Sequence, residues 1–231
     1  MKEQLNKDGV KALLAPFRWA TVMAVSFFLA AGRLDIFRAW LFFGVYFVGA
    51  VVGAIIMWKF ASGLANQRAS IKEGTKTWDK MFLATYFPIS LFIFPIVAGF
   101  DVGRFRWSQL GVTYAIGGVV LYIVCFALGY WAMVVNEHFE GTVRIQKDRM
   151  HKVITSGPYR IVRHPGYLSM ILGGLSASFI IGSLFSLIPC IAAILLIVIR
   201  TYLEDRTLQK ELEGYLEYVK RTKYRLLPGV W

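Results

Sequence analysis

The sequence contains little of what a disulfide framework, a metal site or a water-exposed surface requires. In 231 residues there are two cysteines and three histidines, and only 17% of the residues are charged. Both cysteines, Cys125 and Cys190, lie in apolar runs, so we expect two buried thiols and no disulfide framework or metal site. Soluble domains are about 25% charged on average. Since 57% of this chain is hydrophobic, the composition indicates a single integral membrane domain.

Acidic residues are scarce too, with 14 against 26 lysines and arginines and a net charge of +12. Such an excess is typical of nucleic-acid-binding proteins, but here the basic residues are sorted by connection. The segments 1–18, 59–80, 136–166 and 200–231 hold 22 of them, and the connections in between hold the other four. This is the positive-inside pattern, and it predicts cytoplasmic termini, a basic face against anionic lipid and no nucleic-acid partner.

Six apolar runs make up most of the remaining chain. A helix needs about 20 residues to cross a bilayer, so these runs predict an all-α, polytopic helical bundle of about five to six spans. Gly182-Ser183 interrupts a late stretch of 33 apolar residues, which predicts a helical hairpin of two short helices of about sixteen residues each. The first run follows lysines without a cleavage site, so we expect an uncleaved span. The runs are 13–32, 36–58, 81–100, 111–135, 167–181 and 184–199.

The apolar runs hold almost no ionisable residues apart from Arg18. Transporters and pumps usually carry such groups in mid-membrane, whereas here the polar side chains gather in 136–166 and 200–225. This distribution favours an enzyme that works at the cytoplasmic edge of the membrane over a conduit through it. The spacing Gly49-x-x-x-Gly53 allows close helix packing, which we expect within the monomer more than in a dimer.

The first polar segment leads into GPYRIVRHPGYLS, residues 157–169. A proline commonly takes the first position of a helix, so Pro165 predicts a helix with His164 at its cap. Free N–H groups at such an end favour a carboxylate or a phosphate, and Arg160 and Arg163 add positive charge. The same residues would also suit anchoring at the lipid interface, with the tyrosines in an aromatic belt.

The second polar segment, 200–231, begins with Arg200 and Glu204, which share one face of a predicted helix. They would form either an i, i+4 ion pair or part of a site. The tail that follows alternates tyrosines with lysines and arginines, which suits a helix lying on an anionic surface. From this segment alone, both interpretations stay open.

Together, the two segments resemble the isoprenylcysteine carboxyl methyltransferase family of integral membrane enzymes and its phospholipid methyltransferase relatives. The resemblance covers 136–231 and implies a methyltransferase core there, preceded by N-terminal membrane spans in 1–135. The first 130 residues match only in hydropathy. The residues that carry the resemblance are Gln146, HKVITSGPY (151–159), RHPGY (163–167), Arg200, Glu204, Asp205, Leu208, Gly214, Tyr215, Tyr218 and RLLPG (225–229).

The resemblance implies that S-adenosylmethionine binds in a cytoplasmic pocket that opens through a tunnel toward the lipid. Carried over to the matching positions, it also implies that Arg200 faces and binds the acceptor, and that Arg200 and Glu204 are the catalytic pair, without a metal. The residues that would bind the cofactor are Gln146, His151, Lys152, Val153, Ile154, Tyr159, His164, Pro165, Gly166, Tyr167 and Glu204.

Methyl transfer from a sulfonium requires an acceptor held in line with the methyl group, about 3–3.5 Å away, in a site poor in water. A carboxylate acceptor is already ionised at neutral pH, and Arg200 could hold it by a bidentate pair. We therefore expect carboxyl O-methylation of a lipidated, prenylcysteine-like substrate. Glu204 would meet a positive part of the cofactor, and backbone N–H groups after His164 would meet its carboxylate.

Three alternatives stay open. A related methyltransferase would act on a phospholipid amine or a small thiol, and an amine would give Glu204 or a histidine a proton to remove. Membrane sterol reductases share the HPxY element and use a nicotinamide cofactor. They generally carry an acidic residue soon after that element, where this chain has Leu168-Ser169-Met170. The third alternative is a non-catalytic membrane protein that binds lipid.

Overall fold

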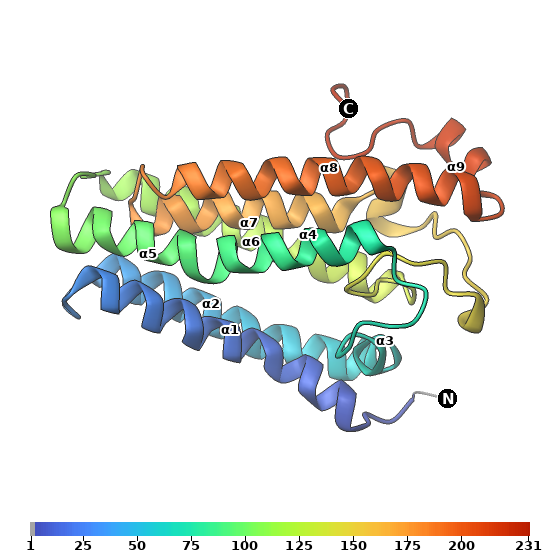
Figure 1. Cartoon of the computed structure of the whole chain (residues 1–231), viewed down its shortest axis with the longest axis horizontal. Coiled ribbons are helices and arrows are strands. Elements are labelled where there is room, and N and C mark those ends of the chain that lie inside the picture. The colour runs from blue at the N-terminus through green and yellow to red at the C-terminus, as the bar shows by residue number, and fades with distance from the viewer. Residues whose placement is uncertain (1–2) are drawn as a thin grey trace.

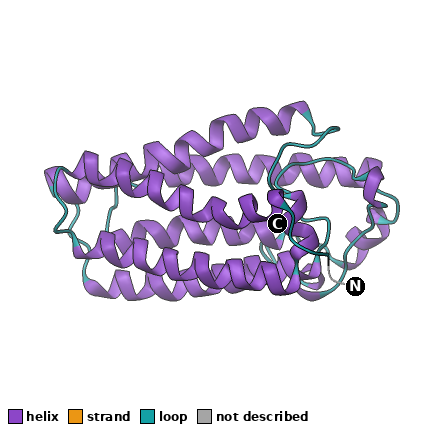
Figure 2. Ribbon diagram, turned by 90° about the horizontal axis from the view of Figure 1, so that it is seen from below, coloured by secondary structure: helices purple, strands orange, loops and turns teal. Residues whose placement is uncertain are grey.

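The computed structural model describes residues 3–231, and over that range it contains helices and loops but no β-strand. Six helical passes of this range run along one axis and form a bundle (Figure 1, Figure 2). The passes are α1 (Lys7–Ala31), α2 (Phe37–Phe60), a continuous helix from α4 (Thr77–Pro88) through η1 (Ile89–Ile93) and α5 (Phe94–Gly99) to η2 (Phe100–Phe105), α6 (Val112–Val135), α7 (Pro165–Ile181) and α8 (Leu187–Glu211). The shorter elements are α3 (Ser62–Gln67), η3 (Lys147–Arg149), η4 (Gly157–Arg160) and α9 (Tyr215–Arg221).

Within the described range, five of these passes are long and apolar enough to cross a membrane, and α7 is the shorter sixth. α7 has 17 residues, and at 1.5 Å each it measures about 26 Å, slightly less than a hydrocarbon core of about 30 Å. The predicted all-α polytopic bundle of five to six spans is confirmed.

The late hairpin is present, but its second helix is longer than the sequence predicts. α7 ends where Gly182 takes a left-handed conformation with φ +88°, which glycine adopts without strain. α8 then has 25 residues, or about 38 Å, instead of about sixteen residues. The prediction was wrong because the apolar run ends at Ile199, while the helix continues to Glu211 through good helix formers such as leucine, glutamine and lysine.

The third pass differs from expectation in a similar way. It runs from Thr77 to Phe105 and includes two aspartates, Asp79 and Asp101, that lie outside the apolar run 81–100. Neither has any exposed surface. The apolar run 81–100 holds no charged residue, as the sequence indicated, and the helix includes the two aspartates because it extends past that run at both ends.

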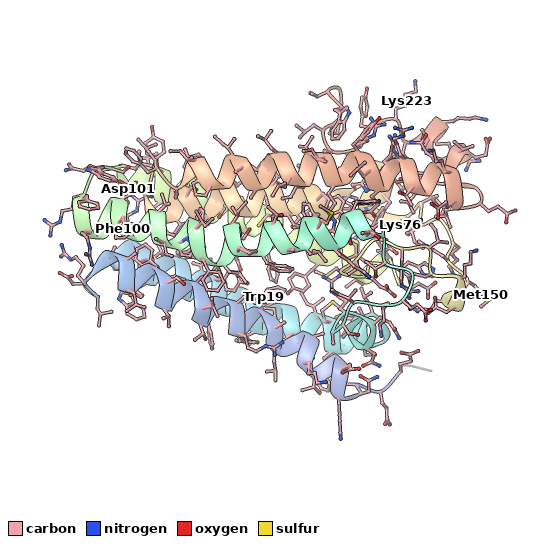
Figure 3. All side chains as sticks on the ribbon, in the orientation of Figure 1. Trp19, Lys76, Phe100, Asp101, Met150 and Lys223 are labelled. Atoms are coloured by element: carbon pink, nitrogen blue, oxygen red, sulfur yellow. The ribbon has the colours of Figure 1, made fainter. Side chains whose placement is uncertain are left out.

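Both chain ends lie toward the same end of the bundle (Figure 1). Lys76, Met150 and Lys223 mark this end, and Phe100 and Asp101 mark the opposite one (Figure 3). We call them the terminal end and the distal end. An even number of passes produces this arrangement, which agrees with the sorting of basic residues along the chain. That the terminal end faces the cytoplasm remains a prediction from the positive-inside pattern.

Small residues bring α2 close to α6. Gly49 and Gly53 face the hydroxyls of Tyr122 and Tyr130, and an added Cβ would lie 2.2 Å and 1.9 Å from those oxygens. Any larger side chain would have to displace the tyrosines. The Gly49-x-x-x-Gly53 spacing therefore serves packing within the monomer, as predicted.

Serine hydroxyls join α6 to α7. Ser176 Oγ donates to the Gly118 carbonyl at 2.8 Å, and Ser169 Oγ donates to the Cys125 carbonyl at 2.8 Å. Cys125 and Cys190 are free, buried thiols, which confirms the prediction of buried side chains outside a disulfide.

Candidate active site

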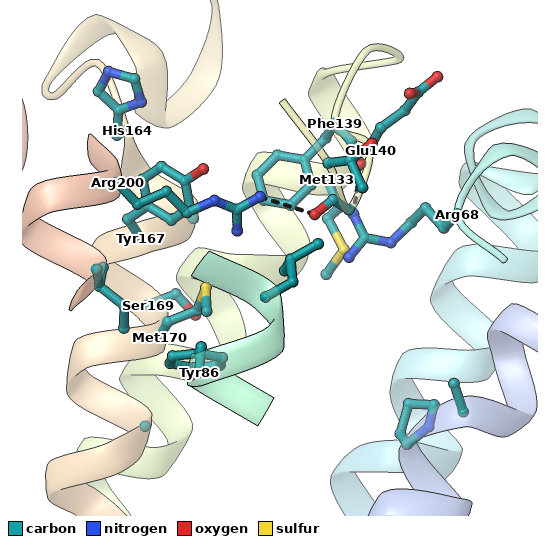
Figure 4. A pocket seen from close by; sticks show the side chains of 18 of the residues that line it. Arg68, Tyr86, Met133, Phe139, Glu140, His164, Tyr167, Ser169, Met170 and Arg200 are labelled. Atoms are coloured by element: carbon teal, nitrogen blue, oxygen red, sulfur yellow. Dashed lines mark hydrogen bonds between the residues drawn. The ribbon is translucent and has the colours of Figure 1, made fainter. Parts of the chain in front are cut away.

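A cavity of about 810 Å³ is lined by side chains from all six passes (Figure 4). Its polar wall comes from the loop between α6 and α7, from the start of α7 and from the second half of α8. Its apolar wall includes Trp19 of α1, Met57 of α2 and Phe87 of α4. The cavity therefore joins a charged region to surfaces that lie among the membrane-spanning helices.

Nearly all the predicted site residues line this one cavity. Pro165 does not, because it is fully buried at the first position of α7. The residues that line the cavity are Gln146, His151, Lys152, Val153, Ile154, Tyr159, His164, Gly166, Tyr167, Arg200 and Glu204.

The loop before α7 is held in shape by its own polar side chains. Gln146 is 2% exposed; its Nε2 donates to the His138 carbonyl at 2.7 Å, and its Oε1 lies 3.2 Å from His138 Nδ1. The Gln146 N–H donates to His151 Nδ1 at 3.3 Å, and the Lys152 N–H donates to His138 Nε2 at 3.4 Å. Gln146 therefore shapes the cavity wall through bonds within the loop.

Both imidazole rings of this wall are neutral at neutral pH. Burial is the main cause that lowers the pKa of His151, to about 4, and nearby His138 and Arg144 act in the same direction. Burial also lowers the pKa of His138, although the bond to Gln146 opposes the shift. A neutral His138 with its proton on Nδ1 satisfies both of its bonds, because Nδ1 donates to Gln146 and Nε2 accepts from Lys152.

Tyr159 is 6% exposed and anchors the loop against the C-terminal segment. Its hydroxyl accepts from Asn136 Nδ2 at 2.9 Å, and its carbonyl accepts from the Tyr218 hydroxyl at 2.7 Å. Its ring packs with Tyr215 and Leu212. Burial raises the pKa of Tyr159, so the phenol stays protonated. The ring is a fixed surface at the cavity edge.

A buried carboxylate, Asp205, ties the start of α7 to the C-terminal segment. It accepts from Arg163 Nε at 2.8 Å, Arg163 Nη2 at 3.0 Å, Arg225 Nε at 2.8 Å and the Tyr215 hydroxyl at 3.0 Å. His164 Nε2 lies 3.2 Å from the same carboxylate. These contacts pair the charge of Arg163 with a carboxylate inside the fold, and they fix the orientation of the His164 ring.

The start of α7 offers fewer free donors than the sequence predicts. Pro165 has no N–H, and the N–H of Tyr167 donates to the His164 carbonyl at 3.1 Å. Within the described residues, that leaves the N–H of Gly166 for a ligand. Gly166 also faces Phe139, where an added Cβ would lie 2.3 Å from the ring, so any larger residue would have to displace that ring.

Glu204 and Tyr167 lie side by side in the wall of the cavity, and both are partly exposed. The Tyr167 hydroxyl donates to Glu204 Oε2. Among residues 3–231, no lysine, arginine or histidine nitrogen lies within 4.0 Å of the Glu204 carboxylate. The i, i+4 ion pair with Arg200 therefore does not form. Glu204 is a carboxylate at the cavity that accepts one hydrogen bond and forms no ion pair, although the charge of Arg200 acts on it from a longer distance.

Arg200 is held by a partner that the sequence did not suggest. Its Nε and Nη2 donate to the two oxygens of Asp79 in α4, at 2.8 and 3.2 Å, and Nη2 also donates to the Gly141 carbonyl at 2.9 Å. Its guanidinium lies over the rings of Phe82 and Tyr167, 4.7 and 5.2 Å from their centroids. The bidentate edge that we expected Arg200 to offer an acceptor carboxylate is thus occupied by Asp79.

Sequence reasoning missed several charged residues at the cavity or next to it, among them Asp79, Arg68, Glu140 and Asp205. Asp79 and Arg68 lie in the part of the chain that matched only in hydropathy, so no motif pointed to them. Glu140 comes before the first residue of the resemblance pattern. Only Asp205 could have been found from the sequence, because it belongs to the resemblance pattern and directly follows Glu204.

The fold and this site define a polytopic helical membrane protein with a charged cavity that extends among its spans. Residues 118–210 match the model of the isoprenylcysteine carboxyl methyltransferase (ICMT) family. The match bears out the resemblance over these residues and, together with the apolar helices, supports a membrane methyltransferase. It includes α7, most of α6 and α8, and every predicted site residue. No individual curated protein matches the chain.

Proposed function

We propose that this membrane methyltransferase uses S-adenosylmethionine, and that it converts a lipophilic carboxylate of the prenylcysteine type into a methyl ester. The observation that carries the proposal is the cavity. Residues predicted to bind the cofactor, from separate segments of the chain, meet along its polar wall, and the rest of it continues among apolar side chains of α1, α2 and α4. Such a cavity suits a polar donor together with a lipid-soluble acceptor.

The residues present fit the donor in charge and size. S-adenosylmethionine carries a sulfonium and an ammonium group, and Glu204 is a carboxylate that forms no ion pair within the described residues. The neutral rings of His138 and His151 add no charge that would repel a cationic donor. The cavity volume of about 810 Å³ falls in the range of roughly 300–1,000 Å³ that is common for ligand sites.

When bound, the donor would supply an electrophilic methyl group on its sulfonium. The protein would position the donor and the acceptor and exclude water from the site. Tyr167 donates to Glu204 and fixes the carboxylate, while Asp79 holds Arg200 over the Tyr167 ring. A carboxylate acceptor is ionised at neutral pH, so no side chain has to remove a proton. The apolar wall keeps the site poor in water, which strengthens charge interactions inside it.

Transfer of a labelled methyl group by the purified protein in lipid vesicles tests the proposal. A prenylcysteine analogue, phosphatidylethanolamine and a small thiol are offered separately. We expect label on the prenylcysteine, in a form that base releases as methanol, because hydrolysis of a methyl ester gives that product. Glu204→Gln should remove most of the transfer. Glu211→Gln, which changes a partly exposed glutamate near the end of the same helix, should leave it intact.

Two results would overturn parts of the proposal. Label in a base-stable amine or thioether product would contradict the carboxylate acceptor. A melting temperature that rises with NADPH and does not change with S-adenosylhomocysteine would contradict the donor and favour a reductase.

A further inference from the structure

Three arginines at the cavity wall each bind a carboxylate through the edge formed by Nε and Nη2. The N···O distances are 2.8 and 3.2 Å for Arg200, 2.8 and 3.0 Å for Arg163, and 2.8 Å twice for Arg144. Their partners, in the same order, are Asp79, Asp205 and Glu140. This edge of a guanidinium matches the two oxygens of a carboxylate, which is why arginine is favoured for such recognition.

Arg68 lines the same cavity with that edge open. Of the contacts in the described chain, its one hydrogen bond runs from Nη1 to the Phe139 carbonyl, and its guanidinium lies 5.2 Å from the Phe139 ring centroid. No carboxylate oxygen of residues 3–231 lies within 4.0 Å of it. Both oxygens of nearby Glu140 accept from Arg144. Nε and Nη2 of Arg68 are therefore available to a ligand.

Arg68 and Arg200 project toward each other from opposite sides of the cavity (Figure 4). Burial lowers the pKa of Arg68, and the charge of Arg200 acts in the same direction, while Tyr130 opposes the shift. Two guanidinium groups that face each other across the cavity repel. Of the two, Asp79 binds only Arg200, and the charge of Glu140 acts on Arg68 without a hydrogen bond between them. An anion in the cavity would relieve this repulsion and give Arg68 its missing partner.

We infer that Arg68 binds the carboxylate of the methyl acceptor through its free Nε–Nη2 edge, and that it thereby selects anionic acceptors. This inference rests on the proposed function and adds the residue that recognises the substrate. The donor also carries a carboxylate, so the same chemistry has two sources. Position favours the acceptor, because Arg68 lies outside the matched region 118–210 and outside 146–204, which supplies the predicted donor site. It also adjoins the apolar wall that a lipid-soluble acceptor requires.

The test compares Arg68→Gln, Arg68→Lys and Arg160→Gln in the full-length protein. Glutamine removes the charge but keeps an N–H donor for the Phe139 carbonyl. Lysine keeps the charge but lacks the Nε–Nη2 edge that binds both oxygens of a carboxylate. Arg160→Gln is the matched control, since it makes the same charge change at an exposed residue outside the cavity. Three quantities are measured: KM for a prenylcysteine acid, affinity for its neutral methyl ester, and affinity for S-adenosylhomocysteine.

We expect Arg68→Gln to raise KM for the acid about tenfold or more, as loss of a charge-assisted pair does. Affinity for the methyl ester and for S-adenosylhomocysteine should not change, because neither ligand presents the acceptor carboxylate. Arg68→Lys should restore part of the loss, and Arg160→Gln should match the wild type.

Three outcomes would overturn the inference. Weaker binding of S-adenosylhomocysteine would assign Arg68 to the donor carboxylate. Equal losses for the acid and the ester would show that Arg68 only supports the structure, and an unchanged KM would show that it binds no substrate. Failure of the proposed function looks different, because the wild-type protein itself would then methylate no prenylcysteine acid.

Discussion

The two ends of the bundle both bury charge, but they satisfy it differently. At the distal end, Asp101 has no exposed surface and accepts from Ser108 N at 2.9 Å, Ser108 Oγ at 2.7 Å, Ser183 Oγ at 2.5 Å and Phe185 N at 3.2 Å. At the same end, Arg38 donates to three backbone carbonyls. Neither residue has a counter-ion among the described residues, yet Asp101 accepts four hydrogen bonds and each of the three guanidinium nitrogens of Arg38 donates one.

At the terminal end, two charged groups at the cavity keep unused capacity. Glu204 accepts one bond from a tyrosine, and Arg68 donates one bond to a backbone carbonyl. Buried polar groups are normally satisfied, because leaving one unpaired costs free energy. A missing counter-ion therefore does not by itself mark a binding site, since Asp101 and Arg38 also lack one. Unused hydrogen-bonding capacity beside a cavity is the better sign.

The largest effect on stability is expected from Asp205→Ala. The change leaves the guanidinium groups of Arg163 and Arg225 without their shared carboxylate. Removing one partner of a buried ion pair typically costs about 3–5 kcal/mol. We therefore expect a clear fall in the melting temperature of the detergent-solubilised protein. Glu217→Ala, which breaks an exposed pair with Lys220, serves as the control, and an equal melting temperature for both variants would contradict the prediction.

A smaller loss of stability is expected from Asp101→Ala, which separates the roles of the two ends. The buried donors of Ser108, Ser183 and Phe185 lose their acceptor. Because the serine hydroxyls can rotate to other partners, we expect a net cost near that of one unsatisfied buried group, about 1–3 kcal/mol. The melting temperature should fall while affinity for S-adenosylmethionine, measured below that temperature, stays at the wild-type value. A large loss of affinity with little loss of stability would show that the distal end takes part in binding.

The pH dependence of stability gives the smallest of these effects. Burial lowers the pKa of His151 to about 4, whereas an unfolded histidine has a pKa of about 6.5. The unfolded chain therefore binds the extra proton first, and stability is lost as the pH falls from about 6.5 toward 4. His151→Asn keeps an acceptor for the Gln146 N–H and removes the titrating ring. Its melting temperature should fall less between pH 7 and pH 5 than that of the wild type, and an identical fall would contradict this assignment.

Much of the fold and one wall of the site could be predicted from the sequence, because their signals are local. Each apolar run contains the middle of a helical pass, and RHPGY places His164 and Tyr167 at the start of α7 next to the cavity. Glu204 follows four residues after Arg200, so a helical repeat puts both on one face. Helix ends were harder, because α8 continues past its apolar run to Glu211.

The partners of these residues could not be predicted. Asp79 and Arg200 are 121 positions apart, and their pairing depends on how α4 packs against α8. Arg68 lies in a connection without a motif, and only the folded chain shows that its Nε–Nη2 edge is left without a carboxylate. The sequence therefore indicated which residues surround the cavity, while the structure showed which of them are already paired.

The most direct test of the account measures the affinity of the purified protein for S-adenosylmethionine by calorimetry, for the wild type, Glu204→Gln and Glu211→Gln. Because Glu204 forms no ion pair within the described residues, removing its charge should weaken donor binding about tenfold or more, or about 1.4 kcal/mol per factor of ten, without lowering the melting temperature. Glu211→Gln should bind as the wild type does. Equal affinity in all three proteins, or no binding by the wild type, would contradict the central claim.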